Sequence, residues 1–195
     1  VAETTTRAAS LRGRPPAIEE ISCVDLFCGA GGLTHGLRLA GVNVRAGVDF
    51  EQACRHPYEA NHEGVVFHQA DVAKLKASTV AAWFGDATVR VLAGCAPCQP
   101  FSTYALRYQK AEKVEDDQRW SLLNHFGRLV TQLLPDIVTM ENVPTVTRHS
   151  VFEDFKSTLE RLGYKVWVEV IDCAQYGLPQ RRNRTVLLAS LHGDI

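Results

Sequence analysis

The sequence predicts an α/β fold with a doubly wound sheet, and three observations support this fold class. Short apolar runs typical of buried strands alternate with segments of helical periodicity. Four strand-then-helix units follow one another, and polar residues suited to ligand binding stand at the ends of the strand segments. The length of 195 residues, with 46% hydrophobic and 22% charged residues, fits one soluble domain with a sizeable core.

Each element follows from its local pattern. Apolar runs predict strands at residues 21–27, 42–48, 65–68, 89–93, 136–140, 164–171 and 185–189. Helical periodicity predicts helices at residues 33–40, 118–134 and 151–162. A further helical stretch runs toward Asn61, and Pro57 is expected to start or bend it. Gly41 ends the first helix, and Pro135 ends the helix at 118–134.

Residues 1–17 are expected to form a flexible tail, and residues 18–195 a single domain. The tail is rich in Thr, Ala, Arg and Pro and lacks the apolar core of a signal peptide. A basic arm that touches DNA through Arg7, Arg12 and Arg14 is the alternative interpretation. No apolar run is long enough to cross a membrane, so no membrane partner is expected. The net charge of −1 argues against strong DNA affinity of this chain by itself.

Six cysteines raise the question of redox or metal chemistry. Without an export signal, reduced thiols are expected. The Cys95-Ala-Pro-Cys98 segment has the C-x-x-C spacing of redox and zinc sites. Zinc needs two further ligands, and no second C-x-x-C or paired-histidine cluster supplies them, so we expect no metal.

A glycine-rich turn, Asp25-Leu-Phe-Cys-Gly-Ala-Gly-Gly32, joins the first strand to the first helix. Its glycines let the backbone approach a ligand closely, and their spacing differs from the G-x-G-x-x-G of dinucleotide sites. Asp49 ends the second strand, where an acidic residue can bind ribose hydroxyls, and the aromatic Phe50 follows it. Asp71 can accept a hydrogen bond from an adenine amino group. These residues favour S-adenosylmethionine over NAD; a structural turn with solvated carboxylates is the alternative.

Two residues suit covalent chemistry on a bound ring. Cys98, in Ala96-Pro97-Cys98-Gln99, stands on a tight loop past an apolar run, where a thiolate suits nucleophilic attack. A buried structural cysteine is the alternative. Glu141 ends another apolar strand, and when protonated it can donate to a ring nitrogen. A salt bridge to an arginine such as Arg184 is the other interpretation of Glu141, and both can hold.

The densest basic cluster consists of Arg181, Arg182 and Arg184, which are expected just before the last strand. Arginine suits bidentate contacts with carboxylate and phosphate groups. Standing alone, the cluster would be read as a solvated basic turn.

Four motifs in a fixed order resemble the DNA (cytosine-5) methyltransferases: Phe27-x-Gly-x-Gly-Gly32, Pro97-Cys98-Gln99, Glu141-Asn142-Val143 and Gln180-x-Arg182-x-Arg184. The resemblance covers about residues 21–189. It implies a Rossmann-like methyltransferase sheet with a final antiparallel strand, S-adenosylmethionine as cofactor and double-stranded DNA as substrate. In that family a cysteine attacks C6 of a flipped-out cytosine, a glutamate binds N3 and the exocyclic amino group, and C5 takes the methyl group.

The resemblance also assigns roles to individual residues of this chain. Catalytic roles are implied for Cys98, Glu141, Arg182 and Arg184. Cofactor contacts are implied for Phe27, Gly29, Gly31, Gly32, Leu33, Asp49, Phe50, Asp71, Val72 and Pro97. DNA contacts are implied for Gln99, Ser102, Arg119 and Arg181. The segment with Asp117, Arg119 and Leu122 is similar to the family's loop that closes over DNA.

The family continues with a variable target-recognition region, an asparagine-bearing motif and a last helix, none of which this chain resembles. We therefore expect the catalytic core of a longer or split enzyme, inactive or nearly so on DNA by itself. A catalytically silent half of a split methyltransferase and a tRNA methyltransferase of the same family are the alternatives. The expected location is the bacterial cytoplasm, at the nucleoid, or the nucleus of a eukaryote.

Overall fold

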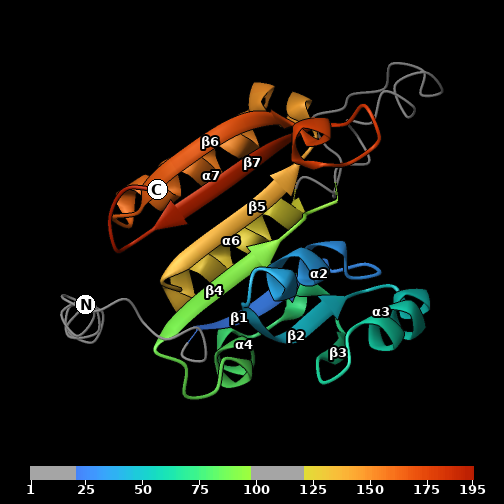
Figure 1. Ribbon diagram of the computed structural model, residues 1–195. Helices are drawn as coiled ribbons and strands as arrows, with labels where there is room; N and C mark the ends of the chain where they lie inside the picture. The colour runs from blue at the N-terminus through green and yellow to red at the C-terminus, as the bar shows by residue number, and fades with distance from the viewer. Residues whose placement is uncertain (1–20, 98–120) are drawn as a thin grey trace, which may run out of the picture.

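The computed structural model describes residues 21–97 and 121–195. They form a seven-stranded sheet of order β3-β2-β1-β4-β5-β7-β6 (Figure 1). Its strands are β1 (Ile21–Leu26), β2 (Asn43–Asp49), β3 (Val66–Gln69), β4 (Val89–Gly94), β5 (Ile137–Asn142), β6 (Lys165–Asp172) and β7 (Asn183–Ser190). β1 to β5 pair in parallel, and β7 is antiparallel to both β5 and β6. The predicted doubly wound sheet with a final antiparallel strand is thus confirmed.

Helices cover the two faces of the sheet (Figure 1). One face carries α2 (Gly32–Leu39) and α3 (Arg55–Asn61). The other carries α4 (Ala77–Trp83), α6 (Ser121–Leu133) and α7 (Ser150–Arg161). Short 3-10 turns complete the described elements: η2 (Gln52–Cys54), η3 (Val72–Lys74), η7 (Pro144–Arg148) and η8 (Cys173–Tyr176).

Alternate side chains of β1 enter two separate cores, as expected for a strand covered on both faces. Val24 and Leu26 belong to the larger core, together with Phe126 of α6. Cys23 belongs to the smaller core, together with Tyr58 of α3. Each of these side chains is fully buried, and burying one large apolar side chain contributes about 1.5–3 kcal/mol. The two cores fix α2 and α3 on the face opposite to α6 and α7.

Most boundaries differ from the sequence-based prediction by one or two residues, and three of these differences bear on the site. β1 ends at Leu26 because Phe27 has φ 58°, which cannot continue a strand. Glu141 lies inside β5 rather than after it, because it pairs with Val186 of β7. Arg184 lies inside β7 rather than before it, because pairing with β6 extends β7 back to Asn183. Helix α4 was not predicted. Val80 is its only buried side chain, so its sequence shows little of the apolar periodicity that indicates a helix.

The order of the strands reverses direction between β1 and β4. β1 leads to β2 and β3 on one side, whereas β4 leads to β5 on the other. Ligands bind beside such a switch point, beyond the carboxyl ends of the strands. There the Cys95 N–H donates to the Leu26 carbonyl at 3.3 Å, which joins the loop after β4 to the end of β1. Because β7 is antiparallel, its first residues reach the same edge.

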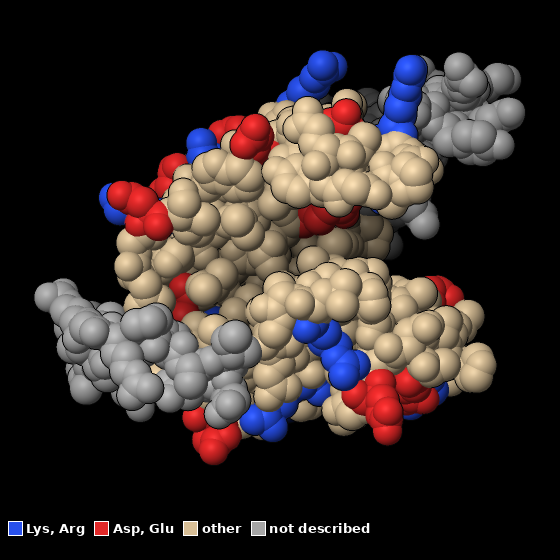
Figure 2. Space-filling view, in the orientation of Figure 1, with Lys and Arg blue, Asp and Glu red and all other residues tan. Residues whose placement is uncertain are grey.

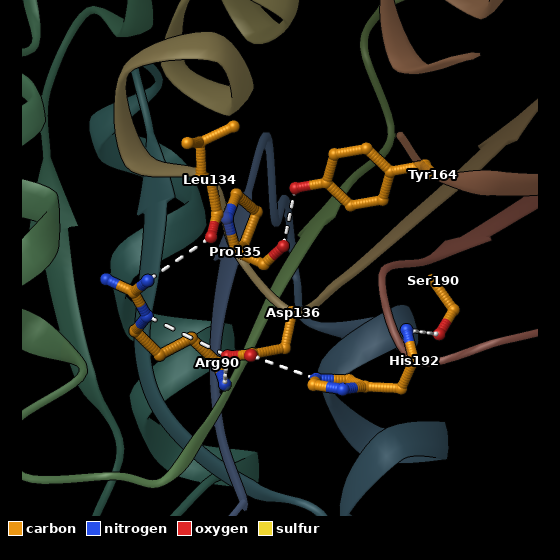
Figure 3. Close-up of polar contacts among 7 residues, drawn as sticks. All are labelled: Arg90, Leu134, Pro135, Asp136, Tyr164, Ser190 and His192. Carbon is orange, nitrogen blue, oxygen red and sulfur yellow. Dashed lines mark hydrogen bonds and ion pairs between the residues drawn. The ribbon is translucent and has the colours of Figure 1, made fainter. Parts of the chain in front are cut away.

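The opposite edge of the sheet holds a polar network that links β4, β5 and the end of β7 (Figure 3). The Asp136 carboxylate, 6% exposed, accepts from the Arg90 backbone N–H at 2.7 Å and lies 3.0 Å from His192 Nε2. The Tyr164 hydroxyl donates to the Pro135 carbonyl in the same region. This network stabilises the beginning of β5, far from the strand ends that bear the motifs. Among the described helices, none combines the length and apolar character that a membrane span requires.

Candidate active site

The turn after β1 adopts a backbone that few residues tolerate. Phe27, Gly29 and Gly31 all have positive φ, at 58°, 54° and 95°. Glycine takes this conformation at little cost, whereas a bulky residue such as Phe27 does so rarely. The Phe27 side chain packs, partly buried, against the larger core. An unusual backbone at a strand end beside the switch point is typical of a ligand site.

The glycine turn fits close approach by a ligand at two of its three glycines. A Cβ added at Gly29 or Gly32 would meet no atom within 4 Å. A Cβ on Gly31 would instead lie 2.0 Å from His62 Nε2, so this glycine is needed for packing inside the protein. Helix α2 starts directly after Gly31 with no acidic side chain in its first turn. Its N-terminal end is therefore electrostatically suited to the carboxylate of S-adenosylmethionine.

Asp49 and Phe50 lie at the end of β2, beside the turn. Asp49 Oδ2 accepts from the Gly29 N–H at 2.9 Å, and Oδ1 accepts from the Glu51 N–H at 2.9 Å. Each carboxylate oxygen keeps a lone pair for a further donor such as a ribose hydroxyl. Phe50 is 66% exposed and offers an aromatic face to a planar ring. These two residues fit the nucleoside part of the cofactor.

Three other residues expected to contact the cofactor have side chains engaged elsewhere. Asp71 Oδ1 caps η3 by accepting from the Ala73 N–H at 2.9 Å, and Oδ2 lies 3.5 Å from Lys74 Nζ. Val72 is buried in the larger core, and Leu33 packs against the smaller one. The Val72 side chain is therefore closed to a ligand, whereas the partly buried Leu33 side chain keeps some exposed surface.

Glu141 is the carboxylate at the carboxyl edge of β5. Arg184 Nε lies 2.6 Å from Glu141 Oε1, and Arg182 Nη2 lies 3.9 Å from the same oxygen. Because Glu141 faces Val186 across the sheet, Arg184 reaches it diagonally from two residues earlier in β7. The Glu141 side chain is 32% exposed, and that of Arg184 is 19% exposed. The arginines orient a carboxylate that still reaches the surface.

The loop after β4 contains Cys95, Ala96 and the exposed Pro97. Burial chiefly, and the nearby Glu141 carboxylate next, raise the pKa of the Cys95 thiol well above its usual value. A raised pKa keeps this thiol protonated, which is unfavourable for a nucleophile. Cys95 is a free thiol, like the other cysteines among the described residues. Residues 21–97 and 121–195 contain no cluster of three or more His, Cys, Asp or Glu able to hold a metal ion.

Several expected site residues lie outside the described residues. These are Cys98, Gln99, Ser102 and Arg119, together with Asp117 and the tail at residues 1–17. Arg181 is described and lies exposed just before β7. The structure thus brings together, at one edge of the sheet, the glycine turn, Asp49, Pro97, Glu141 and Arg184.

Asn142 has a structural role that its place in the Glu141-Asn142-Val143 motif did not predict. Asn142 is buried, and its Nδ2 donates to the Ala96 carbonyl at 3.2 Å, two residues before Cys98. Its Oδ1 accepts from the Val143 N–H at 2.9 Å. The side chain thereby ties the end of β5 to the loop after β4. The signal available in the sequence was an amide beside Glu141 at the end of an apolar strand.

The surface around the site is mixed in charge. Figure 2 shows a hollow between the part of the molecule that contains β6 and β7 and the part that contains α2 and α3, with acidic atoms inside it. On this face, Lys and Arg side chains of the described residues stand singly beside Asp and Glu rather than forming one basic surface. A hollow of this kind suits insertion of a ligand better than broad binding to a phosphate backbone.

The strand order, the glycine turn at the switch point and the acidic residue after β2 define a Rossmann-like S-adenosylmethionine-dependent methyltransferase fold. The sequence pattern of the family described as C-5 cytosine-specific DNA methylase matches residues 21–195. The chain belongs to that family.

Individual relatives agree with this assignment. The type II methylase M.HgiDII of Herpetosiphon aurantiacus is 42% identical over 88% of this chain and 48% of its own length. The type II methyltransferase M.AgeI of Thalassovita gelatinovora is 32% identical over 88% of this chain and 40% of its own. The crystal structure of S. pombe Dnmt2 superposes with a TM-score of 0.73 at 22% identity, covering 90% of this chain and 52% of that one. The chain therefore spans about half the length of the proteins it matches.

Proposed function

We propose that this chain is the catalytic core of an enzyme that transfers a methyl group from S-adenosylmethionine to C5 of cytosine in DNA. The observation that carries the proposal is the position of the Glu141–Arg184 ion pair, 2.6 Å between Nε and Oε1, at the same sheet edge as the glycine turn and Asp49. A carboxyl group held beside a nucleoside-type pocket can exchange a proton or a hydrogen bond with a ring that is placed next to the cofactor. The type II methylases among the relatives support DNA as the substrate.

Each part of the site has a role in this reaction. The cofactor supplies an electrophilic methyl group when it is bound. Gly29 and Gly32 leave room for its approach, and Asp49 and Phe50 hold its nucleoside part. The Cys98 thiolate adds to C6 of the flipped-out cytosine, and C5 becomes nucleophilic. C5 then takes the methyl group as the sulfur–methyl bond breaks, and S-adenosylhomocysteine is the leaving group. Loss of the C5 proton to a base, followed by expulsion of the Cys98 thiolate from C6, releases the methylated ring and regenerates the free thiolate.

Glu141 stabilises the negative charge that the thiolate addition places on the ring. In its protonated form it donates through the O–H to N3, and its other oxygen accepts from the exocyclic amino group. Arg184 fixes the orientation of the Glu141 carboxylate, because its Nε contacts Oε1 from the neighbouring strand. Arg182 places a second positive charge near the same oxygen, with its Nη2 3.9 Å from Oε1. This division of labour makes Arg184 a positioning residue for Glu141.

Covalent trapping tests the proposal. The chain is combined with the C-terminal half of a related type II methylase and incubated with DNA that contains 5-fluorocytosine and with S-adenosylmethionine. We expect a covalent protein–DNA complex with the Cys95→Ala variant and none with Cys98→Ala. Trapping by Cys98→Ala but not by Cys95→Ala would reverse the assignment. Cofactor binding without methyl transfer in any combination would indicate a catalytically silent half.

A further inference from the structure

A buried chain of hydrogen bonds lies directly under the glycine turn. The Thr34 hydroxyl of α2 donates to Asp25 Oδ2 of β1 at 2.7 Å. The Tyr58 hydroxyl of α3 lies 2.9 Å from the same Thr34 oxygen. When Thr34 donates to Asp25, the Tyr58 hydroxyl is the donor of the second bond. All three side chains are 0% exposed, so the chain links three elements through groups that water does not reach.

The ring of Tyr58 fills a space that two glycines leave open. A Cβ on Gly47 of β2 would lie 2.2 Å from the Tyr58 hydroxyl oxygen and from Cζ. A Cβ on Gly31 of the turn would lie 3.0 Å from Tyr58 Cδ2. His62, the residue after α3, packs edge-on against the Tyr58 ring, and the two ring centroids are 4.8 Å apart. The ring therefore supports the turn from below, and its hydroxyl reaches Thr34 on the far side.

The turn is held from the other side by two hydrogen bonds from its backbone N–H groups to β2. The Cys28 N–H donates to the Val48 carbonyl at 3.0 Å, and the Gly29 N–H donates to Asp49 Oδ2 at 2.9 Å. The side chain of Asp49 thus belongs both to the turn and to the pocket for the nucleoside. A shift of the turn by a few tenths of an ångström would move the Asp49 carboxylate with it.

We infer that Tyr58, acting through Thr34 and Asp25, is a positioning residue of the cofactor site and fixes the backbone at residues 27–32 relative to Asp49. The inference rests on the proposed cofactor site. Its direct evidence is the continuous path from the Tyr58 hydroxyl to Asp25, two residues before Phe27. Pure packing would not require the hydroxyl, because a phenylalanine ring fills the same space.

A matched pair of variants separates positioning from general stability. Tyr58→Phe and Tyr164→Phe each remove one buried tyrosine hydroxyl with a hydrogen bond, and Tyr164 lies at the opposite edge of the sheet (Figure 3). Isothermal titration calorimetry with S-adenosylmethionine is expected to show affinity about fivefold lower for Tyr58→Phe, the factor that one net hydrogen bond can supply. Tyr164→Phe is expected to match the unchanged chain. Equal affinities for the two variants would overturn the inference.

Substitutions of Thr34, the middle residue of this hydrogen-bond chain, give a second comparison. Thr34→Val removes the hydroxyl that joins Tyr58 to Asp25, whereas Thr34→Ser keeps it. We expect Thr34→Ser to bind the cofactor more tightly than Thr34→Val does. If Thr34→Val fails to fold, the Tyr58→Phe measurement still decides.

Hydrogen exchange tests the same inference without a ligand. Mass spectrometry of the peptide that contains residues 27–32 is expected to show faster amide exchange in Tyr58→Phe than in Tyr164→Phe. Unchanged exchange in this peptide would contradict the positioning role, even if the cofactor binds. A folded, unchanged chain that fails to bind S-adenosylmethionine at millimolar concentration would instead defeat the proposed cofactor site, and the exchange result would still judge the role of Tyr58.

Discussion

Glu141 and Asp25 are carboxylates near the same edge of the sheet, but their surroundings differ. Glu141 is 32% exposed at its side chain and contacts two arginines. Asp25 is fully buried, and its Oδ1 has no hydrogen-bond partner among the described residues. Burial raises the pKa of Asp25 from 3.8 to about 6; the Thr34 hydrogen bonds oppose this shift, and the nearby Asp49 charge adds to it. Glu141 thus reaches the surface, whereas Asp25 is enclosed by the protein.

Replacing Glu141 by glutamine keeps the shape of the side chain but removes its negative charge and its ability to act as an acid. In the complete enzyme we expect Glu141→Gln to slow methyl transfer by about 10²–10⁴-fold, the usual contribution of a general acid or base. Cofactor affinity should change little, because the Glu141 side chain interacts with Arg182, Arg184 and Cys95 rather than with Asp49 or Phe50. Single-turnover kinetics and calorimetry measure the two effects. Glu169→Gln, on exposed β6, is the control; equal losses of rate and affinity would identify Glu141 as structural.

Asp25 should make the stability of the protein depend on pH. Its raised pKa means that the folded state holds the proton more tightly than the unfolded state does. The stabilisation is complete below about pH 4 and is lost as the pH rises through about 6. Asp25→Asn stays neutral and should therefore gain about 3 kcal/mol relative to the unchanged chain between pH 4 and pH 8.

Urea unfolding of both chains at pH 4.5, 6 and 8 measures this difference. Comparing the two proteins cancels the contributions to stability of the other groups that face Asp25, because the Asn substitution leaves those groups in place. These groups are Asp49, the Tyr58 hydroxyl and the thiols of Cys23, Cys28 and Cys95. Burial raises the pKa of the three thiols and of Tyr58, so they stay uncharged over this range. A stability difference that stays constant with pH would show that Asp25 is not protonated in the folded protein near pH 5.

At the scale of an element, the glycine turn combines two kinds of glycine. Gly31→Ala combines a positive φ with a clash against His62, so we expect a loss of about 2–5 kcal/mol of stability. Gly32→Ala meets open space at the first residue of α2 and should add up to about 1 kcal/mol. The same methyl group should weaken S-adenosylmethionine binding if the ligand approaches there. Thermal unfolding and calorimetry measure both effects; equal stability changes for the two variants would contradict this distinction.

The sequence predicted the strands and helices well where a local pattern determines them. The apolar runs located all seven described strands, and the glycine turn, Asp49 and Glu141 were each placed at the end of a strand. The ends of β5 and β7 were placed short, because pairing between strands distant in sequence extends them. The hydrogen-bond chain from Asp25 to Tyr58 was missed for the same reason. Tyr58 carries no local signal in the sequence, and its partner Thr34 is 24 positions away. The Glu141–Arg184 contact was anticipated because both residues stood in recognisable motifs.

At the scale of the whole molecule, charge and length bear on activity. The chain carries 21 Lys and Arg against 22 Asp and Glu and spans about half of its relatives. Most non-specific DNA affinity comes from Lys and Arg side chains that neutralise phosphates. The nearly balanced charges of this chain predict little affinity of this kind. Unstacking a cytosine costs a few kcal/mol, which DNA contacts must offset.

We therefore expect the chain by itself to bind S-adenosylmethionine but to methylate DNA barely or not at all. Adding a polypeptide that supplies the remaining half of a type II methylase should restore methyl transfer. Incorporation of labelled methyl groups into DNA, with and without that polypeptide, measures the difference. Robust sequence-specific methylation by the purified chain alone would contradict the expectation and place target recognition within residues 1–195.

The placement of Tyr58 between Gly31 and Gly47 also constrains how this sequence can evolve. A side chain at either glycine collides with an aromatic or imidazole ring of the α3 region, and at Gly47 the obstacle is Tyr58 itself. A larger residue at position 47 becomes acceptable only after Tyr58 has been exchanged for a smaller one. The order of the two substitutions therefore matters, because the path that enlarges position 47 first meets this clash and the path that reduces Tyr58 first does not. Such epistasis joins Gly47 of β2 to Tyr58 of α3, two positions that are not neighbours in the sequence.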